Sequence, residues 1–453
     1  MSRMLDHFRA IKECLPEGRT AVMHAVFGLI IAGYTNLLAT KPRIRVRGES
    51  MLDHIVIGRQ PIFNRDFRVV AYEILYRNVD ASLHENKTAQ VAVNALIDIG
   101  VHRIGGALPL YLNVEEDMLL HGGDLLRAFS PQQVYIEILE TVRPDAAVLE
   151  ACRQLKAEGY RLLLDDVLSV QQAQPFIDLV DIIKVDWLDA DDPAGIVRSL
   201  RREGLQFLAE KIEDYDMAQA AEDAGFDLYQ GYFFCRPDLV RGVRPEGYRL
   251  SLLRAMQHAM SAESVNEIFA VIREDVSLSY RLLKYINSAA FSLRCEVRSI
   301  EQALSLLGLN HIRRWLMLLT MSALGNHKPR ELFRQALFRS RFLESMAQCL
   351  GEDEISDDFM LGLLSILDAL LDCTMQQSLD EIRIAPEVHD GLLDPQSPMG
   401  RKLAVCLAIE RGDWDVIHSF KQNGTRLDGR ELNLICTGAI EWADEHMAAL
   451  EAF

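Results

Sequence analysis

Residues 161–186 read RLLLDDVLSVQQAQPFIDLVDIIKVD and contain the pattern that decides the fold. The stretch holds two short and largely apolar runs, at 161–167 and 181–186. Near-continuous apolar runs of this length are typical of strands that are covered on both faces, as in a parallel sheet. Each run also carries a charged side chain close to its end, where the apolar character stops.

The same kind of run recurs on both sides of this stretch, and helical patterns at 146–158 and 193–203 separate some of the runs. The others are VVAYEILYR (69–77), LPLYLNV (108–114), VYIEILE (134–140), LQFLAEKI (205–212) and FDLYQGYF (226–233). Strands that alternate with helices indicate βαβ units, and the sequence therefore predicts a TIM-like (β/α) barrel. The turn signal at 64–66 adds a hairpin at its start.

The character changes after Pro237, because the chain then reads as helix after helix without strand signals. We therefore predict an α/β domain at 51–240, an all-α domain at 248–453 and an amino-terminal extension at 1–50. Residues 21–40 carry no charged side chain and are the only membrane candidate, with a buried or interfacial helix as the expectation and a weak membrane association as the alternative.

Composition narrows the classes of function. The 453 residues carry a net charge of -18, so a nucleic-acid polymer is not an expected partner. A local pocket for a small phosphate ligand remains compatible with this charge. The eight cysteines form no CxxC pair, which favours a reducing cytoplasmic location over a disulfide framework.

Polar side chains recur where the apolar runs stop, and a barrel brings the ends of its parallel strands to one face. These positions are Glu73, Asn113, Glu137, Asp165, Asp166, Lys184, Glu210 and Gln230. A single carboxylate at a strand end is more often a helix cap, but seven successive runs of this kind are not explained by capping. Converging carboxylates repel one another unless cations neutralise them, and hard oxygen ligands suit Mg²⁺ or Mn²⁺. Two such ions favour displacement at phosphorus.

A series of short motifs, spread in order over about 180 residues, resembles the motifs of the EAL family of cyclic di-GMP phosphodiesterases. Glu73-Ile-Leu-Tyr-Arg77 resembles the signature EAL-x-R, and the other motifs follow in family order: YLNV with Asn113, Glu137-Ile-Leu-Glu140, Asp165-Asp166, Lys184-Val-Asp186, Ala209-Glu210-Lys-Ile-Glu213 and Gln230-Gly231-Tyr232. No single motif is decisive, but their order and spacing are specific.

The resemblance implies a role for each matching residue. Glu73, Asn113, Glu137 and Asp165 would bind metal, with Asp166 beside a second ion. Catalysis would involve Glu73, Lys184 and Glu210; the ligand would meet Arg77, Gln230 and Glu213; and Glu140 would support the neighbouring loop. The family reaction opens cyclic di-GMP to linear pGpG, and a homodimer through the barrel is a further expectation.

Three positions depart from the family pattern. Ile74 replaces the alanine of EAL, Lys211 replaces the glycine of AEGVE, and the loop after Asp166 reads Val167-Leu-Ser-Val170 without its two glycines. Glycine supplies backbone freedom that leucine and valine lack. Two alternatives to the enzyme therefore stay open: a cyclic di-GMP receptor with little or no turnover, and a scaffold that acts by protein contacts.

The helical half resembles the HDOD domain, a relative of HD phosphohydrolases, through segments at 274–283, 286–289, 299–308 and 361–364. Ser365-Ile366 stands where the HD enzymes carry His-Asp, and we interpret the later His389-Asp390 as a chance dipeptide. The resemblance implies a module that binds a protein partner. For Asn287 and Trp315 we favour a helix cap and a core aromatic over an interaction surface.

Overall fold

The computed structural model of the protein describes residues 55–78, 99–236, 300–324, 328–352, 355–380, 384–414 and 429–451, together with single residues between these ranges. The predictions for residues 1–50, including the apolar segment 21–40, lie outside this part of the chain. Among the described residues, none of the helices combines the length and the apolar character that crossing a bilayer requires.

Eight strands close into a barrel in chain order, which confirms the predicted TIM-like fold. The strands are β1 (Ile55–Asn64), β2 (Val69–Asn78), β3 (Leu110–Val114), β4 (Val134–Ile138), β5 (Leu162–Val167), β6 (Ile182–Asp186), β7 (Gln206–Glu210) and β8 (Leu228–Gln230). Neighbours from β2 to β8 pair in parallel, whereas β1 runs antiparallel to both β2 and β8. Each of the strands β2 to β8 coincides with one of the predicted apolar runs to within two residues at its start and three at its end.

The predicted hairpin joins β1 to β2. The side-chain oxygen of Asn64 accepts hydrogen bonds from the backbone N–H groups of Asp66 and Arg68, both at 3.0 Å. Phe67 follows in the left-handed region with φ 53°. An asparagine side chain that closes its own turn is a common way to reverse the chain, so the local sequence fixes this connection.

Alternation along the strands decides which side chains fill the barrel. A small inner core of Ile62, Ala71, Tyr111, Leu163, Ile182, Leu208 and Leu228 lies separate from the large outer core. Side chains two residues apart point to the same face of a strand. On six strands the residue two positions beyond the inward apolar side chain is one of the predicted polar residues, so the polar residues form the next layer of the interior.

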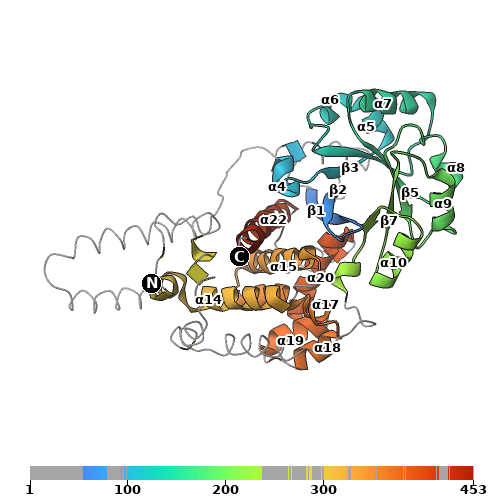
Figure 1. Ribbon diagram of the computed structural model, residues 1–453. Helices are drawn as coiled ribbons and strands as arrows, with labels where there is room; N and C mark the ends of the chain where they lie inside the picture. The colour runs from blue at the N-terminus through green and yellow to red at the C-terminus, as the bar shows by residue number, and fades with distance from the viewer. Residues whose placement is uncertain are drawn as a thin grey trace. The chain divides into compact units, whose positions relative to one another are not determined.

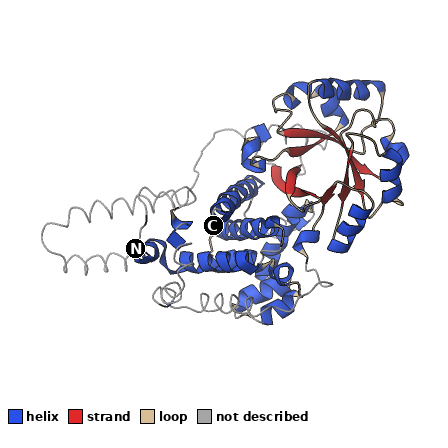
Figure 2. Cartoon of the chain, in the orientation of Figure 1, coloured by secondary structure: helices blue, strands red, loops and turns tan. Residues whose placement is uncertain are grey.

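Helices surround the strands, as Figure 2 shows. They are α4 (Val101–Gly105), α5 (Glu116–His121), α6 (Gly123–Leu126), α7 (Ala146–Ala157), α8 (Val170–Ala173), α9 (Pro193–Leu200) and α10 (Tyr215–Asp223), followed by the 3₁₀ turn η3 (Phe233–Cys235). Three of them begin at an aspartate N-cap whose carboxylate accepts a backbone N–H: Asp145, Asp192 and Asp214. These caps satisfy N–H groups that a helix start leaves free.

Beyond residue 236, every described element is a helix, which confirms the helical second half. The helices are α14 (Ile300–Leu324), α15 (Arg330–Leu350), α16 (Ser356–Leu364), α17 (Leu367–Leu371), α18 (Met375–Asp380), α19 (Pro386–Leu393), α20 (Pro398–Arg411) and α22 (Gly429–Glu451), several of which are labelled in Figure 1. Trp315 is buried in the core, as predicted. The side chain of Asn287, which we predicted to cap a helix, accepts a hydrogen bond of 2.7 Å from the backbone N–H of Val297 and donates one of 2.8 Å to its backbone oxygen.

Residues 51–453 form one compact unit, and the large hydrophobic core includes residues of both the barrel and the described helices. The helices α20 and α22 pack against β1 of the barrel. Arg59 of β1 stacks 4.2 Å above the ring of Tyr72 and forms an ion pair of 2.8 Å with Asp444 of α22. Gly58 lies against α20 so closely that a Cβ there would meet the backbone oxygen of Ile409 at 2.6 Å.

Candidate active site

Seven predicted residues converge in the barrel, one from each of the strands β2 to β8. They are Glu73, Asn113, Glu137, Asp165, Lys184, Glu210 and Gln230, which we call the polar ring. Five members are buried charged side chains, a placement that folding avoids unless partners compensate. The pattern of strand ends therefore predicted a real cluster.

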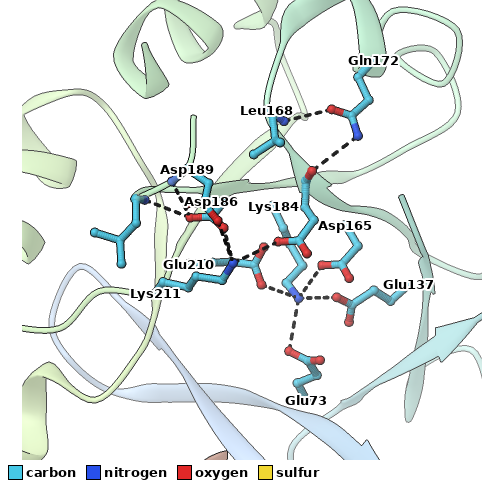
Figure 3. Close-up of polar contacts among 12 residues, drawn as sticks. Glu73, Glu137, Asp165, Leu168, Gln172, Lys184, Asp186, Asp189, Glu210 and Lys211 are labelled. Atoms are coloured by element: carbon cyan, nitrogen blue, oxygen red, sulfur yellow. Dashed lines mark hydrogen bonds and ion pairs between the residues drawn. The ribbon is translucent and has the colours of Figure 1, made fainter. Parts of the chain in front are cut away.

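Lys184 lies at the centre of the polar ring, as Figure 3 shows. Its Nζ lies 3.1 Å from Glu73 and 2.9 Å from Asp165. It also lies 2.8 Å from Glu210 and contacts Glu137. The lysine side chain is 1% exposed, so water screens these contacts very little.

The charges of the polar ring do not balance. Burial lowers the pKa of Lys184, but the four carboxylates around it outweigh burial and hold the pKa well above its ordinary value. Burial, and then repulsion from Glu73, raises the pKa of Glu137 well above its usual range. Burial also raises the pKa of Glu210 to about 8. One ammonium cannot neutralise four carboxylates, and burial together with the remaining repulsion makes Glu137 and Glu210 hold a proton more readily.

Amide side chains complete the polar ring. Asn113 donates a hydrogen bond of 3.1 Å to one oxygen of Glu73, and Gln230 donates one of 2.6 Å to the other. Gln230 also donates to Gln60 of β1 at 2.9 Å. Sequence reasoning missed Gln60, although its alternation with the inward Ile62 is the signal that could have found it.

Four buried oxygens of the polar ring accept no hydrogen bond from the described residues. They are Asn113 Oδ1, Glu137 Oε2, Glu210 Oε2 and Gln230 Oε1. A buried acceptor without a partner costs about 1–3 kcal/mol, so several together point to a missing donor or cation. Amide and carboxylate oxygens in a net negative cavity are the ligand set of a hard divalent cation. The residues present therefore fit the metal that the sequence predicts.

Asp165 also belongs to a second group of carboxylates beside the polar ring. Carboxylate oxygens of Glu140, Asp165 and Asp166 lie within 4.8 Å of one another and could hold a cation. The pairing of β5 with β6 shifts register between Leu164 and Val167, and Asp166 takes a positive φ of 43°. This irregularity turns two successive carboxylates toward the same end of the barrel. Glu140, predicted to support the loop, thus lies among possible ligands.

The loop without glycines begins directly after Asp166. Val167 is buried in the core, whereas Leu168 is 44% exposed. Gln172 of α8 accepts a hydrogen bond from the backbone N–H of Leu168 at 3.0 Å and donates one to the backbone oxygen of Asp166 at 3.4 Å. The Gln172 side chain therefore holds the segment that follows Asp165 and Asp166.

Two predicted ligand-binding residues are not part of the polar ring. The carboxylate of Glu213 forms an ion pair of 3.1 Å with Arg236. Arg77 belongs to β2, but its side chain lies outside the described part of the chain. Their roles at the ligand stay predictions.

Gly231 explains how the residue before it is placed. Its φ is 150°, and a Cβ there would lie 2.0 Å from the backbone oxygen of Ile212. The backbone N–H of Ile212 donates a hydrogen bond of 3.0 Å to the backbone oxygen of Gln230. Only glycine allows this close approach, which fixes Gln230 at the end of β8.

Comparisons with known proteins identify the families of the two halves of the chain. An EAL domain family model matches residues 52–237, and an HDOD domain family model matches residues 249–388. The uncharacterized protein YuxH of Bacillus subtilis is 30% identical over 87% of this chain and 99% of its own length. The cyclic di-GMP phosphodiesterase CdgJ of Vibrio cholerae is 28% identical over 79% of this chain and 85% of its own length.

Solved structures resemble part of the chain. An EAL domain protein of Listeria monocytogenes is 17% identical and covers 41% of this chain and 90% of its own, with a TM-score of 0.33. The Klebsiella pneumoniae protein BlrP1, solved with manganese and cyclic di-GMP, is 21% identical and covers 42% of this chain and 56% of its own, with a TM-score of 0.36. From the two family models in this order, and from a relative matched along nearly its whole length, we conclude that the chain belongs to the family of proteins that join an EAL domain to an HDOD domain.

Proposed function

We propose that the barrel of this chain is a metal-dependent phosphodiesterase that opens cyclic di-GMP to the linear dinucleotide pGpG. The observation that carries the proposal is the polar ring, in which Lys184 and four carboxylates meet at the carboxyl end of a barrel. A protein that only binds the nucleotide has no need to keep Glu73, Lys184 and Glu210 together. The name of the relative CdgJ supports the same substrate.

The proposed cofactor is a pair of Mg²⁺ or Mn²⁺ ions. Glu73, Asn113, Glu137 and Asp165 would hold one ion, with Asp166 beside the second. Such ions, when bound, lower the pKa of a coordinated water and offset negative charge on a phosphoryl oxygen. The unpartnered oxygens of Asn113 and Glu137 support this assignment.

The remaining roles follow from position. In the reaction a water oxygen forms a bond to phosphorus, the bond from phosphorus to the 3′ oxygen breaks, and that oxygen leaves as a hydroxyl after taking a proton. Lys184 would stabilise negative charge that develops on the phosphate, because its ammonium is fixed and desolvated. Glu210 would hold that ammonium in place through their contact of 2.8 Å.

The proposed ligand contacts are peripheral to the polar ring. Arg77 would bind a ligand phosphate, for which a guanidinium fork is suited. Gln230 would contact the ligand at the same face, and Glu213 would do so once released from Arg236. Glu140 would support the loop beside Asp166 or contribute an oxygen to the second ion.

Incubation of the purified full chain with cyclic di-GMP and Mg²⁺ or Mn²⁺, followed by chromatography for pGpG, tests the proposal. We expect product from the wild type and none above background from Glu73→Ala. Absence of product from the wild type, together with measurable binding of cyclic di-GMP, would overturn the enzyme and establish the receptor alternative. Loss of both binding and turnover would instead favour the scaffold.

One observation favours the receptor as the second candidate. The segment after Asp166 lacks the family glycines, and Gln172 holds it through two backbone hydrogen bonds. A loop held in this way offers little freedom to change with ligand state. Substitution Gln172→Ala separates the two candidates, because it should raise turnover in a slow enzyme and leave a true receptor inactive.

We further propose that the helical half binds a protein partner and that the barrel forms a homodimer in a cytoplasmic protein. The dimer proposal rests on the family resemblance. The six described cysteines are all free, which suits a reducing compartment. Size-exclusion chromatography with light scattering of the full chain tests the dimer.

A further inference from the structure

A second lysine lies beside the polar ring but outside it. The Nζ of Lys211 contacts Asp186, and it lies 3.6 Å from Asp189 and 3.9 Å from Asp166. Figure 3 shows this side chain reaching across from the end of β7 toward the loop after β6. Lys184 therefore contacts Asp165, whereas Lys211 lies beside the next residue, Asp166.

The backbone at Lys211 is unusual for a lysine. Its φ is 56°, in the left-handed region that favours glycine. The position directly follows Glu210, the last residue of β7. A residue with a long side chain persists in such a conformation only where the surrounding structure holds it there. Here the Lys211 ammonium forms an ion pair with Asp186, a carboxylate that is itself 1% exposed.

Asp186 anchors the ammonium firmly. Besides Lys211, it accepts backbone N–H groups from Leu188 at 2.9 Å and from Asp189 at 3.0 Å. The buried carboxylate is thus fully engaged by donors from its own loop and by one ammonium. Movement of Lys211 away from Asp186 would leave a buried carboxylate without its ammonium partner, which costs more than the loss of a surface pair.

The ammonium is close to the oxygens that could take a second cation. Asp166 contributes an oxygen to the group with Glu140 and Asp165, and Lys211 lies 3.9 Å from the Asp166 carboxylate. A positive charge at this distance repels a divalent cation on the same carboxylate and already offsets part of the negative charge. The Lys211 side chain is 48% exposed, so solvent weakens the effect without removing it.

We propose that Lys211 acts as a resident cation that replaces much of the charge of the second metal ion, so that the chain binds one divalent ion tightly and a second only weakly. The inference rests on the proposed function, because it concerns the same metal site. It assigns the site a different metal requirement from a barrel with glycine at this position. Removal of the ammonium should tighten binding of the second ion by about tenfold or more, and tenfold corresponds to about 1.4 kcal/mol.

Titration of the metal-free full chain with Mn²⁺ alone tests the inference. Calorimetry and the electron paramagnetic resonance signal of free Mn²⁺ give the number of sites and their dissociation constants without any activity measurement. We expect one tight and one weak site in the wild type, and two tight sites in Lys211→Gly and Lys211→Ala. Lys211→Arg, which keeps the charge, should resemble the wild type. In Lys211→Ala, a further Glu140→Gln change should weaken the second site again.

The outcomes are separable from those of the proposed function. Two equally tight sites in the wild type, or no change in Lys211→Ala that folds as judged by circular dichroism, would overturn the role of Lys211 while leaving hydrolysis standing. Two tight sites in Lys211→Ala against one in the wild type, with no pGpG from either protein, would confirm the role of Lys211 and refute the enzyme. Failure of the wild type to bind Mn²⁺ at all would refute both.

Discussion

Substitution of Lys184 by methionine removes the only ammonium in contact with the carboxylates of the polar ring among the described residues. Methionine keeps most of the length of the side chain, so the change is one of charge. Breaking a buried ion pair costs about 3–5 kcal/mol, because the partner carboxylates stay buried without compensation. With four carboxylates around a lysine that is 1% exposed, we expect the metal-free protein to lose at least this much.

The same substitution should make stability depend on metal. A divalent cation that binds only the folded protein stabilises it by about 2.7 kcal/mol at a concentration of 100 times its dissociation constant. Urea unfolding of Lys184→Met with EDTA and with Mn²⁺ measures both effects. Lys156→Met is the matched control, because its lysine forms a single pair of 2.8 Å with Asp181 and is 36% exposed. Loss of such a surface pair costs at most about 1 kcal/mol.

Two results would refute this reasoning. If Lys184→Met were as stable as Lys156→Met in EDTA, the carboxylates would not be held together against their repulsion in the folded protein. If the free energy of unfolding of Lys184→Met were no higher in Mn²⁺ than in EDTA, the polar ring would not be a cation site. Circular dichroism at zero denaturant establishes that each variant starts folded.

Gly58→Ala should lower the free energy of unfolding, measured with urea, by about 1–3 kcal/mol, because its Cβ would lie 2.6 Å from the backbone oxygen of Ile409. Gly438→Ala in α22 is the control, because a Cβ there meets nothing within 4 Å, and it should raise the free energy of unfolding by about 0.5–1 kcal/mol. Equal effects would show that β1 and α20 are not in contact. In EDTA, stability should fall as the pH rises from about 4.5 to 8, because the raised pKa of Glu210 means that the folded state binds the proton more tightly than the unfolded state. Glu210→Gln should flatten this part of the pH profile, and an unchanged slope would assign it to another group. Gly231→Ala should lower the melting temperature and abolish turnover, because the backbone at its φ of 150° leaves no space for a Cβ; wild-type turnover would contradict this.

The sequence allowed the polar ring to be predicted because two simple rules govern it. Alternation along a strand fixes which side chains point inward, and a barrel brings the ends of its parallel strands together. Glu137, Lys184 and Glu210 follow from these rules alone. Only the family resemblance gave them the chemistry of phosphodiester cleavage.

Other features depend on geometry that no periodic pattern encodes. The register shift that turns Asp166 beside Asp165 arises from the pairing of two strands and leaves no signature in the residues themselves. The ion pair between Lys211 and Asp186 joins residues from different strand ends, and a lysine after a strand is an ordinary surface residue by composition. The packing of α20 and α22 on β1 joins segments more than 300 positions apart, and amphipathic helices do not specify their partners.

The central claim is that the polar ring hydrolyses cyclic di-GMP with the help of divalent ions. The most direct measurement follows pGpG formation by the wild type in Mn²⁺, after removal of the metal with EDTA, and after addition of excess Mn²⁺. We predict product in the first sample, none in the second and recovered product in the third. Undiminished product in EDTA, or no product in any sample that binds cyclic di-GMP, would contradict the claim.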